Sequence, residues 1–259
     1  MVRELTGKMP FVFHPDDMPQ GLQLKKNTID VWFMSLDIDE SCLESFLGIL
    51  SEEEHVKARR MRIEKYRKHY VAARGLLRQI IAKYMNEAPE HLEFQYGQDG
   101  KPALAEAFSS TGLTFNLSHS HGLALVCIAC ERAIGVDIEK IQQDKSVTEI
   151  AKRFFSNREY EALIRLPAEQ RKQGFYNCWT RKEAYLKAIG TGLVFPLDRF
   201  DVSLTPGEPA ALLGHRTDPE QVSMWSIVDL DAGPDYAAAL AVEGKDFTVK
   251  RQSGVRNQV

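Results

Sequence analysis

The sequence contains little cysteine, no strong excess of charge and no long apolar run. Only four of its 259 residues are cysteine, too few for the disulfide framework that holds small secreted domains together. The formal net charge of −3 argues against nucleic-acid binding by bulk charge. No apolar stretch is long enough to cross a membrane, and the first thirty residues lack the pattern of a secretion signal. We therefore expect a cytoplasmic protein that binds neither nucleic acid nor membrane.

One pair of cysteines has the spacing of a redox or zinc motif. Cys127 and Cys130 are separated by two residues, but they lie in the apolar run 123–130, which is typical of a buried strand. Residues three apart in a strand point to opposite faces, and no second pair completes a zinc site. We interpret both as buried structural thiols.

Hydrophobic periodicity predicts two successive sets of helices and strands. In the first half we expect a strand at 28–36, helices at 41–50, after Ser51 and at 67–85, and strands at 92–96, 114–117, 123–130 and 134–139. In the second half we expect helices at 147–155, 157–166 and 171–189, and strands at 201–204, 222–230, 236–242 and 247–250.

This order predicts an α+β fold built from two similar subdomains with antiparallel strands. The short turn 131–133 predicts a hairpin between the strands on either side of it. We place the N-terminal subdomain at 1–133, the C-terminal subdomain at 134–250 and a tail at 251–259. No repeat is visible at the level of residues, so the internal duplication is an interpretation of element order alone.

Acidic side chains are concentrated on one predicted strand. Because alternate residues of a strand share a face, Asp137 and Glu139 point together, whereas Val136 and Ile138 point to the core. A bland alternative is the end of a strand that emerges into solvent.

A second acidic and basic group lies on one predicted helix. Residues four apart share a helix face, so Trp179, Glu183 and Lys187 line up, with Lys182 beside them. The bland alternative is an exposed face with an ion pair. Carboxylates suit Mg²⁺, which completes its shell with water and substrate phosphates. The two groups together favour phosphoryl-type transfer.

Two further stretches have weaker signals. Of nine Lys and Arg residues between 57 and 78, most fit a solvated helix face, but Arg74 lies in an apolar stretch and needs a partner, for which an anionic ligand is one candidate. Lys101 follows a glycine in a turn and would by itself be ordinary surface. The run 118–121 alternates serine and histidine, with His119 the better phosphate candidate and His121 incidental.

The combined set resembles the 4′-phosphopantetheinyl transferase superfamily, specifically its Sfp-type (surfactin-synthetase-activating) class. The resemblance rests on Gly100-Lys101-Pro102, Asn116 to Ser120, Gly135 to Glu139 and Trp179 to Gly192, which occur in the family's order within residues 57–203. It implies two similar α+β subdomains related by a pseudo-twofold, with coenzyme A in the cleft between them.

The resemblance also implies roles for individual residues. It implies magnesium ligands at Asp137, Glu139 and Glu183, with Mn²⁺ able to substitute, and a general base at Glu183 or Lys187. The implied contacts to the diphosphate are Lys182 and His119. The implied contacts to the adenosine end of coenzyme A are Arg74, Lys101 and Ser118 at the 3′-phosphate and Pro102 near the adenine.

The expected reaction moves the 4′-phosphopantetheine arm of coenzyme A to a serine of an apo carrier protein and releases adenosine 3′,5′-bisphosphate. We expect a monomer that meets its carrier through the stretch 154–160, for which a simple core role is about equally supported. Two rival functions are a magnesium-dependent nucleotide phosphohydrolase and a non-catalytic binder of coenzyme A or carrier proteins.

Overall fold

The computed structural model describes residues 18–19, 21–97, 100–142, 146–192 and 195–252. The first half contains β1 (Thr28–Ser35), α1 (Glu40–Ile49), α2 (Glu52–Arg60), α3 (Glu64–Met85), β2 (Phe94–Tyr96), β3 (Pro102–Leu104), β4 (Leu113–Ser120) and β5 (Leu123–Cys130). The second half contains β6 (Ile134–Lys140), α4 (Val147–Phe154), α5 (Asn157–Arg165), α6 (Ala168–Ile189), β7 (Phe200–Val202), β8 (Leu212–His215), α7 (Gln221–Met224), β9 (Trp225–Asp229), β10 (Tyr236–Glu243) and β11 (Thr248–Arg251). Short 3-10 turns occupy Pro89–His91, Glu106–Thr111 and Leu197–Arg199.

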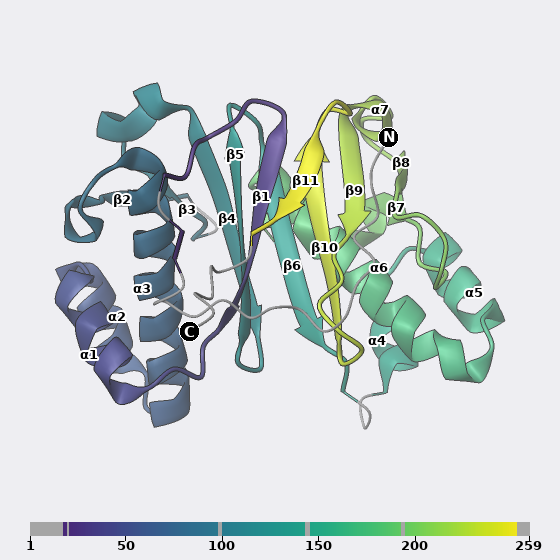
Figure 1. Ribbon diagram of the computed structural model, residues 1–259. Helices are drawn as coiled ribbons and strands as arrows, with labels where there is room; N and C mark the ends of the chain where they lie inside the picture. Colours follow the sequence, from purple (N-terminus) through teal and green to yellow (C-terminus); the bar gives the residue numbers. More distant parts are fainter. Residues whose placement is uncertain (1–17, 20, 98–99, 143–145, 193–194, 253–259) are drawn as a thin grey trace, which may run out of the picture.

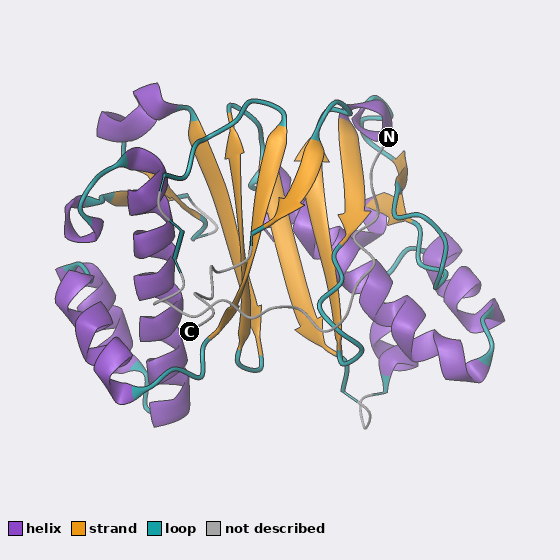
Figure 2. Cartoon of the chain, viewed as in Figure 1, coloured by secondary structure: helices purple, strands orange, loops and turns teal. Residues whose placement is uncertain are grey.

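Two sheets form the centre of the molecule, with helices on both outer sides (Figures 1 and 2). The first sheet has the order β11-β1-β5-β4 and the second has the order β6-β10-β9. Helices α1 to α3 cover the first sheet and α4 to α6 cover the second. The predicted α+β class is confirmed.

Strand alternation explains why the sheets are buried on both faces. On β1, Trp32 and Met34 pack toward the first set of helices, whereas Val31 and Phe33 pack toward the second sheet. On β10, Ala239 packs toward α6 and Leu240 packs toward the first sheet. The apolar runs in the sequence therefore belong to strands that separate two cores.

The predicted hairpin at 131–133 is wrong. Strand β5 pairs with β1 along one edge and with β4 along the other, so it has no free edge for β6. Strand β6 instead starts the second sheet and pairs with β10. The turn carries the chain from one sheet to the other.

Two other expectations about the strands need correction. β11 pairs in parallel with β1, so residues 248–251 belong to the first sheet although they end the described chain. The proposed boundary assigns β11 to the C-terminal subdomain, whereas in space β11 is part of the sheet of the N-terminal subdomain. The segment 222–230 is a short helix followed by β9, and β8 had no signal in our interpretation.

The two sheets meet along β4 and β6 through side chains rather than through a backbone ladder. Backbone N–H groups of β6 donate to side-chain oxygens of β4 at three positions: Val136 to Asn116 (2.7 Å), Ile138 to Ser118 (3.4 Å) and Lys140 to Ser120 (3.1 Å). The N–H groups of β6 on this edge therefore receive partners where no second strand lies in register.

The two halves share a feature at the level of individual residues. Helices α2 and α5 both begin with a serine-glutamate capping box, Ser51 with Glu54 and Ser156 with Glu159. Each is followed by a 22-residue helix, α3 or α6. Each capping glutamate is also buried, which gives it a second role.

That second role is to neutralise buried cations of the long helix. Glu54 accepts from Nε of Arg74 (2.6 Å) and from Nε of Arg78 (2.7 Å). Glu159 pairs with Lys182 at 2.8 Å. Since the glutamate also accepts the N–H of its own capping serine, one carboxylate both starts a short helix and fixes it against a long one.

We expect Glu159→Ala to destabilise the protein by about 3–5 kcal/mol, because it leaves Lys182 charged and unpaired in the core. The matched control is Glu161→Ala in the same helix, where the pair with Arg165 is exposed and should contribute about 0.5 kcal/mol or less. Urea unfolding of both variants measures the difference. Equal losses would contradict the anchoring role of Glu159.

Candidate active site

Gly135 allows α6 to lie directly against β6. A Cβ atom at this position would fall 2.1 Å from the carbonyl oxygen of Ala184 and 2.3 Å from the nitrogen of Ala188, so only glycine permits this approach. The close approach places Glu183 and Lys187 of α6 beside the acidic face of β6. Gly135 therefore has a packing role. Without it, α6 could not lie close enough to bring Glu183 beside Asp137 and Glu139.

Asp137 lies at the centre of the group and is only 4% exposed. Its Oδ1 accepts hydrogen bonds from Oγ of Ser118 at 2.9 Å and from Nζ of Lys187 at 2.6 Å. Lys187 Nζ also donates to Ser118 Oγ at 3.0 Å. One oxygen of Asp137 is thus held by an ion pair and a hydroxyl.

Glu139 lies two residues further along the same strand face. Its Oε2 accepts a hydrogen bond from Oγ of Ser120 at 2.9 Å. The serines of β4 therefore orient the carboxylates of β6, one serine to each carboxylate.

Glu183 completes the acidic group. Burial raises the pKa of this carboxyl to about 7, and the negative charges of Asp137 and Glu139 act in the same direction, whereas Lys187 opposes them. Neighbouring carboxylates destabilise the ionised form of Glu183. Binding of a cation at this position would relieve that repulsion and is therefore favourable.

Two buried carboxylate oxygens have no hydrogen-bond partner within the described residues: Oδ2 of Asp137 and Oε1 of Glu183. Buried polar atoms are nearly always satisfied, so these two oxygens fit ligands for a hard cation. In the part of the chain that the structure describes, no three His, Cys, Asp or Glu side chains are yet grouped closely enough to hold a metal ion. The donor chemistry fits Mg²⁺, and ligands would need to draw together around it.

His119 alternates with the two serines and points away from β6. Loss of solvent around its ring lowers the pKa of His119, and the positive charges of Lys187 and His69 lower it further. The imidazole is therefore neutral at neutral pH and offers an N–H donor without a charge.

Lys101 lies between the two halves. Its Nζ donates to the carbonyl oxygen of Ile134 at 3.2 Å and to the carbonyl oxygen of Lys187. The next residue, Pro102, opens β3 opposite Tyr96. The segment with Lys101 and Pro102, which we predict to contact coenzyme A, is thereby attached to the end of α6 that carries Lys187.

Three residues predicted to contact the ligand have internal partners in the structure. Lys182 is fully buried and donates to the carbonyls of Leu197 and Phe200 in addition to its pair with Glu159, so it faces the second core and not the acidic group. Arg74 is 5% exposed and already paired with Glu54.

Ser118 is the third of these residues. Its hydroxyl donates to Asp137, and its contact with the 3′-phosphate stays a prediction. The sequence could not reveal these partners because each comes from a segment distant along the chain.

The stretch 154–160 has two kinds of residue. Phe155, Ser156 and Glu159 are buried, which fits the core interpretation. Phe154 is 39% exposed and packs edge-on against Trp179. Phe154, together with the exposed Asn157 and Arg158, remains a candidate for carrier contact.

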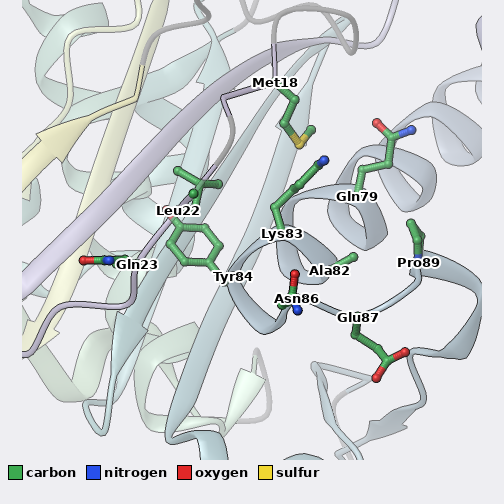
Figure 3. Close-up of a pocket in the computed structure, with 11 residues that line it drawn as sticks. Met18, Leu22, Gln23, Gln79, Ala82, Lys83, Tyr84, Asn86, Glu87 and Pro89 are labelled. Carbon is green, nitrogen blue, oxygen red and sulfur yellow. The ribbon is translucent and has the colours of Figure 1, made fainter.

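A cavity of about 740 Å³ lies elsewhere in the described structure. Figure 3 shows it between the C-terminal end of α3, with Lys83 and Asn86, and the N-terminal segment with Met18 and Leu22. Lys83 lies fourteen positions after His69 in α3, or roughly 21 Å along the helix. His69 is the α3 residue whose charge acts on His119 beside the acidic group. No predicted site residue lines this cavity.

Comparisons with known proteins agree on one family. A family model described as "4'-phosphopantetheinyl transferase, N-terminal" matches residues 39–133, and one described as "4'-phosphopantetheinyl transferase superfamily" matches residues 133–241. The 4′-phosphopantetheinyl transferase HetI of Nostoc sp. (strain PCC 7120) is 40% identical over 226 residues, which cover 87% of this chain and 92% of that protein. The 4′-phosphopantetheinyl transferase Sfp of Bacillus subtilis (strain 168) is 30% identical over 216 residues, which cover 83% and 92%.

A solved structure is also similar. A holo-(acyl-carrier-protein) synthase from Bacillus anthracis in complex with CoA is 21% identical, with a TM-score of 0.36 over 44% of this chain and 96% of that chain. From the family models and the two relatives, the chain belongs to the 4′-phosphopantetheinyl transferase superfamily. It is an enzyme of that class.

The pKa of Glu183 predicts a measurable pH dependence of stability. Because the folded-state pKa is raised from 4.5 to about 7, the metal-free protein loses stability as pH rises through this interval and then stays lower. In Glu183→Gln the side chain is neutral throughout, so its Tm in chelator should exceed that of wild type by roughly 7–14 °C at pH 8 and by much less at pH 5. Thermal unfolding at several pH values checks this. The exposed control Glu161→Gln should show no such trend, and a pH-independent gain for Glu183→Gln would contradict the assignment.

Proposed function

We propose that this enzyme transfers the 4′-phosphopantetheine arm of coenzyme A to a serine hydroxyl of an apo carrier protein and releases adenosine 3′,5′-bisphosphate. Family membership supports the reaction class. The acidic group with two partnerless buried oxygens, on Asp137 and Glu183, is the single observation that supports placing the diphosphate here. The cytoplasm and a monomeric state remain our expectations for where and how the enzyme acts.

We assign the metal ligands to Asp137, Glu139 and Glu183, with Mg²⁺ as the resident ion and Mn²⁺ as a substitute. A divalent cation held here would supply positive charge to the diphosphate and would stabilise the negative charge that develops on adenosine 3′,5′-bisphosphate as the bond between the two phosphates breaks. The protein's part is to hold three carboxylates in one place, which the serines of β4 and the close packing at Gly135 support.

Glu183 is the better supported of the two candidate general bases. Its buried oxygen Oε1 has no hydrogen-bond partner among the described residues and can accept the proton of the carrier serine. Lys187 already donates its ammonium protons to Asp137 and Ser118. As a base it would have to break its ion pair with Asp137 before it could accept a proton from serine. We propose that Lys187 orients Asp137 and donates to phosphate oxygens.

For the remaining parts of coenzyme A we keep three contacts. His119 offers a neutral N–H to the diphosphate, Lys101 offers its ammonium group to the 3′-phosphate, and Pro102 lies near the adenine. Lys182, Arg74 and Ser118 stay predictions, because in the structure their side chains are bound to the carboxylates of Glu159, Glu54 and Asp137.

The metal assignment predicts that Asp137→Ala abolishes transfer, because one buried ligand and the partner of Lys187 disappear together. Intact-mass analysis of an apo carrier incubated with coenzyme A and Mg²⁺ measures the reaction, and Mn²⁺ should restore activity after chelation of wild type. Asp198→Ala, at an exposed carboxylate, serves as the control and should react normally. Undiminished wild-type activity in excess chelator would refute the role of the metal. Turnover of coenzyme A without a carrier would favour the phosphohydrolase instead.

The 3′-phosphate assignment predicts that dephospho-coenzyme A is a poorer substrate. A charge-assisted contact contributes roughly 1.5–3 kcal/mol, so KM should rise by about one to two decades. Lys101→Ala should narrow this preference, whereas Asp137→Asn should lower activity with both substrates. Comparing the ratio of kcat/KM for the two substrates cancels general damage to the fold, and an unchanged ratio in Lys101→Ala would show that Lys101 does not contact the 3′-phosphate.

A further inference from the structure

His121 lies in the two-residue turn between β4 and β5, immediately after Ser120. Its φ is +47° and that of Gly122 is +86°, which is the left-handed pair that such tight hairpins require. Glycine adopts this conformation most readily, and histidine is among the few other residues that are enriched in it. We propose that His121 is a positioning residue for Glu139 and acts through the hydroxyl of Ser120. The proposal rests on the metal site assigned above.

The hydrogen-bonding capacity of Ser120 defines what His121 contributes. A serine hydroxyl has one proton to donate and two lone pairs with which to accept. Ser120 Oγ donates its proton to Oε2 of Glu139 at 2.9 Å and accepts from the N–H of Lys140 at 3.1 Å. Nδ1 of His121 lies 3.1 Å from the same oxygen. Because the proton is already used, Nδ1 must carry a hydrogen and donate to the second lone pair.

Ser118, two residues earlier on the same face, has the same arrangement. Its hydroxyl donates to Oδ1 of Asp137, accepts from the N–H of Ile138 and accepts from Nζ of Lys187. Each serine therefore holds one carboxylate, takes one N–H of β6 and receives one side-chain donor. His121 does for Ser120 what Lys187 does for Ser118.

The backbone of His121 is also fixed. Its carbonyl oxygen accepts the hydroxyl of Tyr236 at 3.1 Å, and Tyr236 is the strand partner of Lys140. The turn is thus held to the same end of β6 whose N–H binds Ser120. With both the ring nitrogen and the carbonyl engaged, the Ser120 hydroxyl has one orientation that satisfies all its neighbours, and that orientation points at Glu139.

Two substitutions separate positioning from a role in the turn. His121→Gly removes the donor and relieves the left-handed strain, so its Tm should equal or exceed that of wild type. His121→Asn keeps a nitrogen at the place of Nδ1 and also tolerates positive φ. We expect the Kd for Mn²⁺, measured by electron paramagnetic resonance without coenzyme A, to weaken roughly tenfold in His121→Gly and to stay within about twofold in His121→Asn.

A background variant shows whether the effect passes through Ser120. In Ser120→Ala, the further change His121→Gly should leave Mn²⁺ affinity unchanged, since the intermediate hydroxyl is absent. Unaltered Mn²⁺ affinity in His121→Gly, or an equal loss in His121→Asn, would overturn the proposal. Asp137→Ala distinguishes the two levels of failure: if it weakens Mn²⁺ binding while His121→Gly does not, only the role of His121 is wrong. If Asp137→Ala also leaves binding intact, the metal assignment itself is wrong.

Discussion

The row of side-chain acceptors on β4 is the interaction on which the rest of the structure depends. Asn116, Ser118 and Ser120 accept N–H groups of β6, which lies in a different sheet. A backbone ladder would have used carbonyl groups and left the side chains free to point elsewhere. A serine hydroxyl that accepts an N–H group of β6 can still donate its own proton. Those protons are donated to Asp137 and Glu139, so the contact that joins the two halves also orients the acidic group.

The two halves solve the problem of a buried charge in one way but use different cations. In each, the glutamate of a capping box is enclosed by a short and a long helix. The first half balances it with Arg74 and Arg78 of α3, and the second with Lys182 of α6. Removing either glutamate would leave its partners charged in an apolar core, whereas a surface pair would be replaced by water. These anchors hold the outer helices, and α6 in turn presents Glu183 and Lys187.

Much of the fold and part of the site could be predicted from local sequence pattern. Periodicity located α3, α6, β5 and β10 because each has an apolar face of the right repeat. It also placed Asp137 beside Glu139, and Glu183 beside Lys187, because these pairs lie within single elements. Pairing between strands could not be predicted, since it depends on which edges other strands already occupy.

The internal partners of Lys182 and Arg74 were missed for a related reason. A motif lysine and an isolated arginine look like ligand contacts when the glutamates that neutralise them lie about twenty residues away in another helix. Gly135 did carry a signal, because a glycine in a strand interior often marks close backbone approach. The order of elements indicated a duplication. The capping boxes of α2 and α5 are the matching residues that the two halves share.

The parallel pairing of β11 with β1 has a consequence for synthesis of the chain. A ribosome releases the amino end first, so β1 emerges long before the residues that will cover its outer edge. Until then β1 presents unpaired backbone groups, which are a template for association with other chains. Gln252 makes the closure specific, since its amide donates to the buried carboxylate of Asp30 on β1 at 2.6 Å. The first sheet is therefore complete only after residues 248–251 have been made, and a nascent chain halted earlier would carry an open edge.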